Sequence, residues 1–263
     1  MAAEMIPLKS ESVIFQDSPL HQAHEYVAKF PGLSLYIAQA PWALKLLSQL
    51  WTTQELEEKG RHSVRVAANA EIVGKEYFHL PQVLMHPLIE AAFTHDVGFE
   101  GLDPEVLKAS NWSDALRDHA QRSVDKILPF SRAAAAVAIA VHRDGAIRER
   151  DGAINMYPTV VPLALRDTTA EDDVRVLHEK GVPQLLSLLD KIDAMRAPRM
   201  YREINPNRPD FFTKAQTQDR LAAMKDTHRN RVYPDDDLIE FALNAWDIVD
   251  ARMRSNQAQL ARV

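Results

Sequence analysis

The chain has no cysteine among its 263 residues, which excludes disulfide bonds, thiolate metal sites and a cysteine nucleophile. Any bound metal ion must therefore be held by histidine, aspartate or glutamate. The chain also lacks a run of about 18 apolar residues, the length that a membrane-spanning helix requires. Its first residues, MAAEMIPLKSESVIF, have neither the basic start nor the continuous apolar stretch of a secretion signal. We therefore expect a cytoplasmic protein without a membrane partner.

Glycine is scarce, at eight residues, and the alternation of apolar and polar residues typical of β-strands is almost absent. Apolar residues recur instead every three or four positions along most of the chain. This pattern predicts an all-α fold, and no shift in composition divides residues 1–263 into separate domains. The net charge of −6 disfavours a nucleic-acid platform, which usually carries a basic surface.

The periodic segments predict a series of helices, separated by proline and glycine. They cover residues 19–30, 41–57, 61–78, 87–95, 112–128, 131–142 and 184–195, and a last helix follows the acidic residues 235–237. A loop is expected around residues 80–86. The last helix carries an apolar stripe that predicts either a packing element or a homodimer contact.

Several ionisable residues interrupt the apolar faces of these helices or end them. Leu88, Ala91, Ala92 and His95, for example, recur at i, i+3, i+4 and i+7, so the imidazole should point inward. The full set is His62, His95, Asp96, His119, His142 and Asp190. Imidazoles and carboxylates that converge from separate helices are typical of a site for one or two divalent ions, either Fe, Mn, Zn or Mg.

The segments HSVRVAANA, AAFTHDVG, AVAIAVH and LLSLLDKIDAMR, in this order, resemble the HD superfamily of metal-dependent phosphohydrolases. The resemblance implies a helical HD core over about residues 58–200, with additional N- and C-terminal helices, the latter in an extension over residues 205–263. It implies that His62, His95, Asp96 and Asp190 bind the first ion. His119 and His142 match the extra histidines of the binuclear branch, in which Asp96 would bridge two ions.

Alternative interpretations of three residues stay open. His119 can be an exposed helix residue, and His142 can cap the C-terminus of its helix. Glu58 lies four residues before His62, where one binuclear subgroup has a further carboxylate ligand, although Gly60 would interrupt that helical turn.

The reaction that the resemblance implies is hydrolysis of a phosphate ester in a nucleotide or another small metabolite, with a metal-activated hydroxide. The resemblance implies that Asp96 is the central catalytic residue, and Lys191 is a candidate electrostatic helper. Arg143, Arg148 and Arg196 are candidates for binding the phosphate oxygens. Residues 145–182 contain three glycines and two prolines and predict a long surface loop that can act as a lid.

Three other functions compete with this hypothesis. Phe99 stands where a phosphate-contacting lysine often follows the His-Asp pair, and some members of the superfamily use the same ligands to hold two irons that activate dioxygen. A related hydratase group also begins with a His-Ser-x-Arg-Val segment like residues 62–66. The third alternative is a sensory domain that has kept the fold and lost turnover.

Overall fold

The fold is all-α, as the sequence predicts. The computed structural model describes residues 18–103, 118–139, 141, 176–177, 181–197, 211–227 and 236–260, and within these residues every regular element is a helix. The predicted residues His142, Arg143 and Arg148 and most of the expected lid, residues 145–182, lie outside this part of the chain.

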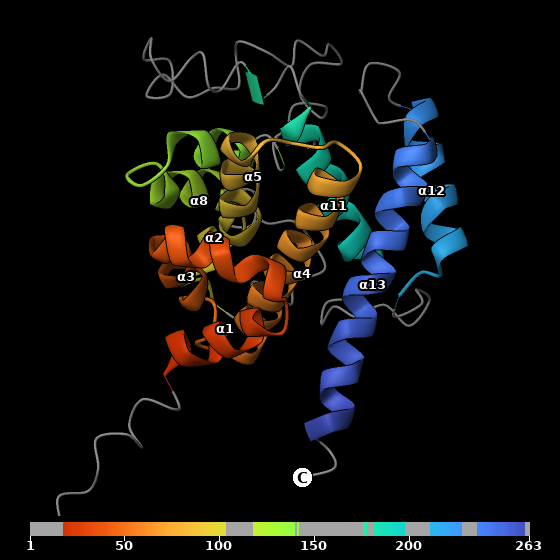
Figure 1. The fold of residues 1–263 in the computed structure, drawn as a ribbon. Coiled ribbons are helices and arrows are strands. Elements are labelled where there is room, and N and C mark those ends of the chain that lie inside the picture. The colour runs from red at the N-terminus through yellow and green to blue at the C-terminus, as the bar shows by residue number, and fades with distance from the viewer. Residues whose placement is uncertain are drawn as a thin grey trace, which may run out of the picture.

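The described residues contain eleven named helical elements, and Figure 1 labels most of them. They are α1 (Pro19–Ala28), η2 (Pro31–Leu33), α2 (Ser34–Gln39), α3 (Pro41–Ser48), α4 (Gln54–Glu76), α5 (Gln82–Thr94), η3 (Val97–Phe99), α8 (His119–Ile127), α11 (Val182–Arg196), α12 (Lys214–Thr227) and α13 (Asp236–Leu260). Residues 132–139 are also helical. Helices α4 and α5 lie side by side at the centre, and α11 packs against both of them and against α13.

Helix α4 begins earlier than the sequence analysis predicts, and the helix before it ends sooner. The hydroxyl of Thr53 accepts a hydrogen bond from the backbone N–H of Leu56 over 3.3 Å, and this N-cap starts the helix at Gln54. The expected helix over residues 41–57 is therefore wrong in its second half. Gly60 does not interrupt α4, which continues through it, and its missing side chain makes room for the indole of Trp51.

Helix α5 also begins before its predicted start, so the loop expected around residues 80–86 is mostly helical. Pro87 lies inside the helix and cannot donate to the carbonyl four residues earlier, that of Val83. Val83 is 71% exposed, which allows water to satisfy that carbonyl. The proline therefore leaves the helix intact.

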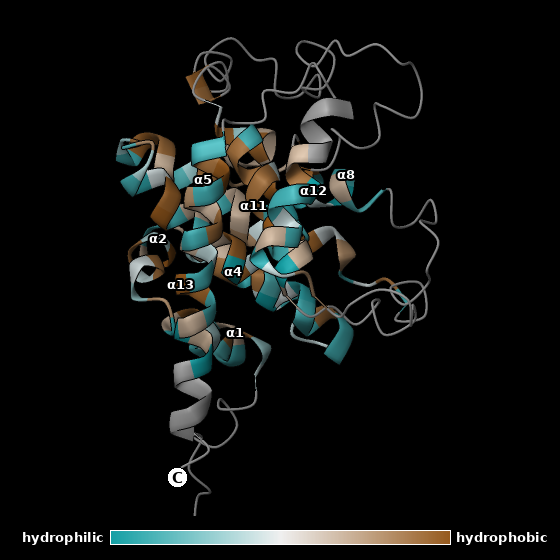
Figure 2. Ribbon diagram, turned by 90° about the vertical axis from the view of Figure 1, so that its right-hand side faces the viewer, coloured by the Kyte–Doolittle hydropathy of each residue, from teal (hydrophilic) through white to brown (hydrophobic). Residues whose placement is uncertain are grey.

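The core forms where the apolar faces of α4, α5, α11 and α13 meet. Figure 2 shows hydrophobic segments of α5 and α11 gathered at the centre of the molecule. Val66, Leu88, Leu189 and Val249, one from each of these helices, are fully buried. The apolar stripe of α13 thus packs within its own chain, against α4 and α11. A homodimer contact stays a prediction and would have to use another face of this helix.

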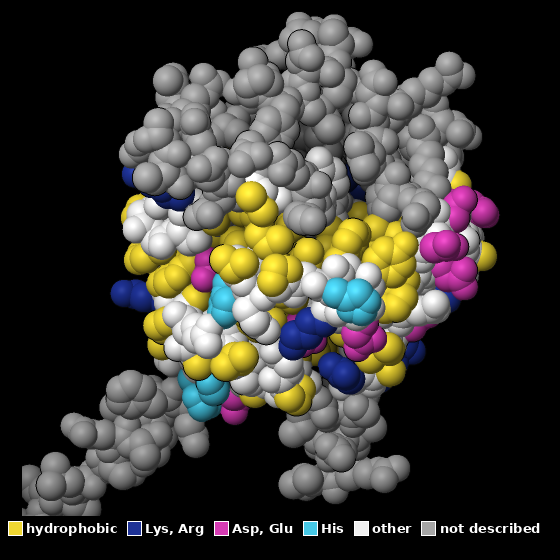
Figure 3. Space-filling view, turned by 45° about the horizontal axis from the view of Figure 1, so that its top comes forward, with side chains coloured by type: hydrophobic (Ala, Val, Ile, Leu, Met, Phe, Trp, Pro, Cys, Tyr) yellow, Lys and Arg dark blue, Asp and Glu magenta, His cyan; other side chains and the backbone are white. Residues whose placement is uncertain are grey.

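The visible surface mixes side chains of different kinds. On the face turned forward in Figure 3, hydrophobic side chains form a broad band, and basic, acidic and histidine side chains lie close together beside it. Among the described helices, none combines the length and the apolar character that crossing a bilayer demands.

Candidate metal centre

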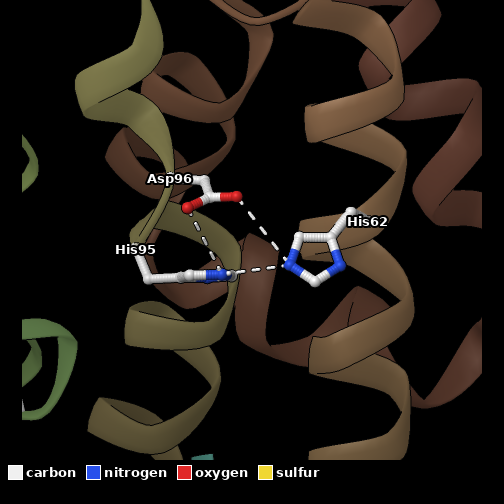
Figure 4. Close-up of side chains that lie close together, drawn as sticks. All are labelled: His62, His95 and Asp96. Carbon is white, nitrogen blue, oxygen red and sulfur yellow. Dashed lines mark hydrogen bonds and ion pairs between the residues drawn. The ribbon is translucent and has the colours of Figure 1, made fainter. Parts of the chain in front are cut away.

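Three of the predicted ligands meet in the core. His62 comes from the middle of α4, whereas His95 and Asp96 follow the last residue of α5. The Nε2 atoms of the two histidines are 3.3 Å apart, and each lies 3.7 to 3.8 Å from an oxygen of Asp96. Figure 4 shows the three side chains pointing toward one another, and all three are buried.

The local sequence explains the direction of His95. Leu88, Ala91 and Ala92 are fully buried, and their shared face carries the imidazole into the core, as predicted. The Nδ1 atom of His95 lies 2.9 Å from the carbonyl oxygen of Ala92, to which it can only donate. When the imidazole is neutral, this bond places the lone pair on Nε2, the nitrogen that faces His62 and Asp96 and that would bind a metal ion.

Asp190 of α11 supplies a fourth group. Its Oδ1 atom is 2.9 Å from Nε2 of His62 and 3.7 Å from Nε2 of His95, and its side chain is 21% exposed, so it lies at the edge of the site. Burial by itself would raise the pKa of this carboxyl, but the hydrogen bonds with His62 and His95 outweigh it and hold the pKa well below its usual value. Asp190 is therefore ionised at neutral pH.

Neighbouring carboxylates also change the pKa of His95. Burial alone would lower the pKa of its imidazole, but the neighbouring carboxylates of Asp96 and Asp190 outweigh that effect and raise the pKa. The carboxylates of Asp96 and Asp190 thus favour a positive charge on the imidazole of His95. A divalent cation in the same place would satisfy these carboxylates and leave that imidazole neutral. Two nitrogens and two carboxylates fit a borderline or hard divalent ion.

His119 joins this set from α8, whose approach depends on Gly98. A Cβ atom on Gly98 would overlap the carbonyl oxygen of His119, and the N–H of Gly98 donates to the hydroxyl of Ser123 over 2.8 Å. Because α8 packs this closely, Nε2 of His119 lies 3.7 Å from Oδ1 of Asp96. The ring of His119 is buried and stacks on Phe99, with 4.0 Å between the ring centroids. His119 is therefore no exposed helix residue.

Asp193 is part of the centre, although the sequence analysis missed it. Its Oδ2 atom accepts a hydrogen bond from Nδ1 of His62 over 2.6 Å. Its Oδ1 atom accepts from Nε of Arg65 over 2.8 Å and from Nε1 of Trp246 over 3.0 Å. Asp193 follows Asp190 by three residues, and Arg65 follows His62 by three, so both pairs share a helical face. This spacing was the available signal.

The ion pair behind His62 is fully enclosed. Burial would raise the pKa of Asp193, but the charge of Arg65 and the hydrogen bond from His62 outweigh it and hold this pKa far below its usual range. Burial would likewise lower the pKa of Arg65, but Asp193 raises it well above its usual value. Both groups are charged, and the pair fixes the orientation of the His62 ring.

Two of the predicted phosphate-handling residues make contacts within the protein. Nζ of Lys191 donates to the hydroxyl of Ser187 over 2.5 Å, one turn earlier in α11. Nη2 of Arg196 donates to Asp247 of α13 over 2.6 Å. Glu58, an alternative ligand, accepts from Arg65 over 3.1 Å.

Lys59 is a second residue that the sequence analysis missed. Its Nζ atom lies 3.5 Å from Oδ2 of Asp96 and 4.1 Å from the centroid of the Phe99 ring. Lys59 precedes His62 by three residues in α4, so the two side chains share a face of the helix. A lone lysine carries no sequence signal of this kind, because lysine is common on exposed helix faces.

Comparison with models of known protein families, with curated proteins and with solved structures finds no match to this chain. The resemblance to the HD superfamily therefore stays a prediction. The buried group formed by His62, His95 and Asp96 could hold a metal ion on its own geometry.

Proposed function

We propose that this chain is a metal-dependent phosphohydrolase of the HD superfamily, acting in the cytoplasm on a small phosphorylated metabolite. One observation carries the proposal. The Nε2 atoms of His62 and His95 lie 3.3 Å apart, and each lies within 2.9 to 3.8 Å of a carboxylate oxygen of Asp96 and of Asp190, so the four residues meet from three separate parts of the chain. These are the four positions that the resemblance implies for the first ion.

In this proposal the side chains of the centre have separate roles in binding metal ions and in orienting the ligands. The first ion would be held by His62, His95, Asp96 and Asp190. A second ion would be held by Asp96 and His119, with His142 as the further predicted ligand. Divalent ions at such a site supply Lewis-acid activation of water and neutralise phosphate charge. The carboxylate of Asp193 accepts a hydrogen bond from Nδ1 of His62, so Nε2 is the ring nitrogen that would bind the ion.

Dioxygen activation by two irons is the second candidate function. The stacking of Phe99 on His119 favours it, because an apolar ring lies beside the histidine of the second ion. Nitrogen and carboxylate ligands suit iron as well as manganese or zinc, so the ligand set does not separate the two reactions. Their co-substrates do, since hydrolysis consumes water and oxygenation consumes dioxygen.

The test is an assay of the protein, purified without chelators, against a panel of phosphate esters in an oxygen-electrode cell. The proposal predicts release of phosphate without oxygen uptake. Asp96→Ala should abolish it, whereas Asp125→Ala, which removes an exposed carboxylate on α8, should not. Oxygen uptake coupled to substrate loss would favour the oxygenase. A metal-loaded protein that turns over nothing in the panel would favour a sensory domain.

A further inference from the structure

We propose that Lys59 is a substrate-binding residue whose ammonium group binds an oxyanion of the phosphate class at the metal centre. The inference rests on the proposed function and names the group that receives the anionic part of the substrate.

The amine lies on one particular side of the candidate centre. Oδ2 of Asp96 is 3.5 Å from Nζ of Lys59 and 3.8 Å from Nε2 of His62. The other oxygen, Oδ1, is the one that lies near His95 and His119. An anion that enters on the side of Oδ2 and His62 therefore meets the ammonium group next to the ion.

Phe99 holds the amine in this position. Its ring centroid is 4.1 Å from Nζ, a distance at which the negative face of an aromatic ring attracts a cation. The side chain of Lys59 is 20% exposed, whereas that of Asp96 is 3% exposed, so the amine spans from the edge of the site toward its interior. An ammonium group in this place keeps hydrogens available for a ligand, because it carries three donors.

The balance of charge favours an anion. The carboxylates of Asp96 and Asp190 together match the charge of one divalent ion, and Arg65 is paired with Asp193 behind His62. Lys59 then adds a positive charge next to the neutralised ligand set, and a second ion would add more. A positively charged site that is largely shielded from water attracts oxyanions such as phosphate.

Among the described residues, the two other basic side chains that were predicted for the site, Lys191 and Arg196, contact other groups. Lys191 contacts the hydroxyl of Ser187 in its own helix, and Arg196 contacts Asp247 of α13 while stacking on Trp246. Lys59 instead contacts a metal-ligand carboxylate directly. The structure therefore favours Lys59 for anion binding over both of these predicted residues.

The experiment measures binding of inorganic phosphate to the full-length protein loaded with Mn²⁺, by titration calorimetry, after elemental analysis has given the metal content. Lys59→Met removes the charge and keeps the length of the stem on Phe99. Lys59→Arg keeps the charge. Lys45→Met, on an exposed face of α3, is the matched control.

The proposal predicts normal metal content in all variants, with phosphate binding weakened at least about tenfold in Lys59→Met. Lys59→Arg should stay within about threefold of the wild type, and Lys45→Met should bind phosphate as the wild type does. Unchanged phosphate binding in Lys59→Met overturns the assignment, and so does a metal-loaded wild type that binds no phosphate. Loss of metal from Lys59→Met shows a positioning role instead. A wild type that binds no metal refutes the proposed function itself.

Discussion

Asp193 accepts a hydrogen bond from Nδ1 of His62 over 2.6 Å, while Nε2 of the same ring faces His95 and Asp190. The two nitrogens of one imidazole thus have different tasks. One is bound to a carboxylate that Arg65 keeps ionised, and the other is directed at the candidate metal position. Such an outer carboxylate orients a ligand and increases its basicity.

Replacing Asp193 should therefore weaken metal binding without removing a ligand. We expect Asp193→Asn to lower the affinity for Mn²⁺ or Zn²⁺ by about 10- to 100-fold. Competition with a chromophoric chelator measures this affinity. Asp247→Asn changes a carboxylate that contacts Arg196 away from the centre and serves as the control. Equal affinities in Asp193→Asn and the wild type would refute the orienting role.

Trp246 connects the C-terminal helix α13 to the same carboxylate. Its indole N–H donates to Oδ1 of Asp193 over 3.0 Å in the core. Trp246→Phe removes this donor to a charged group, so the free energy of unfolding should fall by about 1.5–3 kcal/mol, plus the lost packing. Urea denaturation measures the change. Trp42→Phe changes a partly buried ring that stacks on Phe130 and should lower the free energy of unfolding by less than Trp246→Phe does. A larger decrease in Trp42→Phe than in Trp246→Phe would contradict the role of this hydrogen bond.

Gly98 sets the distance between α8 and the centre. A methyl group at this position overlaps the backbone carbonyl of His119, so Gly98→Ala should push α8 away and destabilise the fold by about 1–3 kcal/mol. It should also reproduce the metal content of His119→Ala, which elemental analysis measures. In Gly32→Ala the atoms nearest to the new methyl group belong to the flexible carboxylate of Glu71, so this control should keep wild-type metal content. Gly98→Ala with wild-type stability and metal content would refute the close approach.

Acid should destabilise the metal-free protein through Asp193. Its pKa in the folded state lies below the usual value of about 4, so the unfolded chain takes up the proton first as the pH falls. The stability that this carboxylate contributes is present above about pH 4 and is lost progressively below it. Urea denaturation in chelator between pH 7 and pH 3 measures this loss. Asp193→Asn should show a smaller decrease over the same range, and an identical decrease would contradict the assignment.

The sequence predicts the fold class and the inward direction of the ligands because both follow from one periodicity. Leu88, Ala91 and Ala92 form a fully buried apolar stripe, and His95 lies on the same face of the helix. Burial of the stripe therefore turns the imidazole inward. Helix ends were predicted less well, since the start of α4 depends on one hydroxyl, that of Thr53. Periodicity carries no information on such a cap.

The supporting residues of the site could not be predicted in the same way. Lys59 looks like any lysine on an exposed helix face until Phe99 and Asp96 are placed beside it. In the sequence, Gly98 looks like a residue that ends a helix. In the structure, its missing side chain leaves room for the backbone of α8. These roles depend on contacts between segments far apart in the chain, which spacing along one helix does not report. Arg65 and Asp193 were missed as well, although each follows a predicted ligand by three residues, and this spacing could have indicated them.

The metal content of protein purified without chelators tests the central claim most directly. We expect one or two divalent ions per chain in the wild type, about one in His119→Ala if two ions are bound, and almost none in Asp96→Ala. Asp125→Ala, which changes an exposed carboxylate of α8, should match the wild type. A wild type without metal, or an Asp96→Ala variant that retains the wild-type content, would contradict the claim that His62, His95, Asp96 and Asp190 form a metal centre.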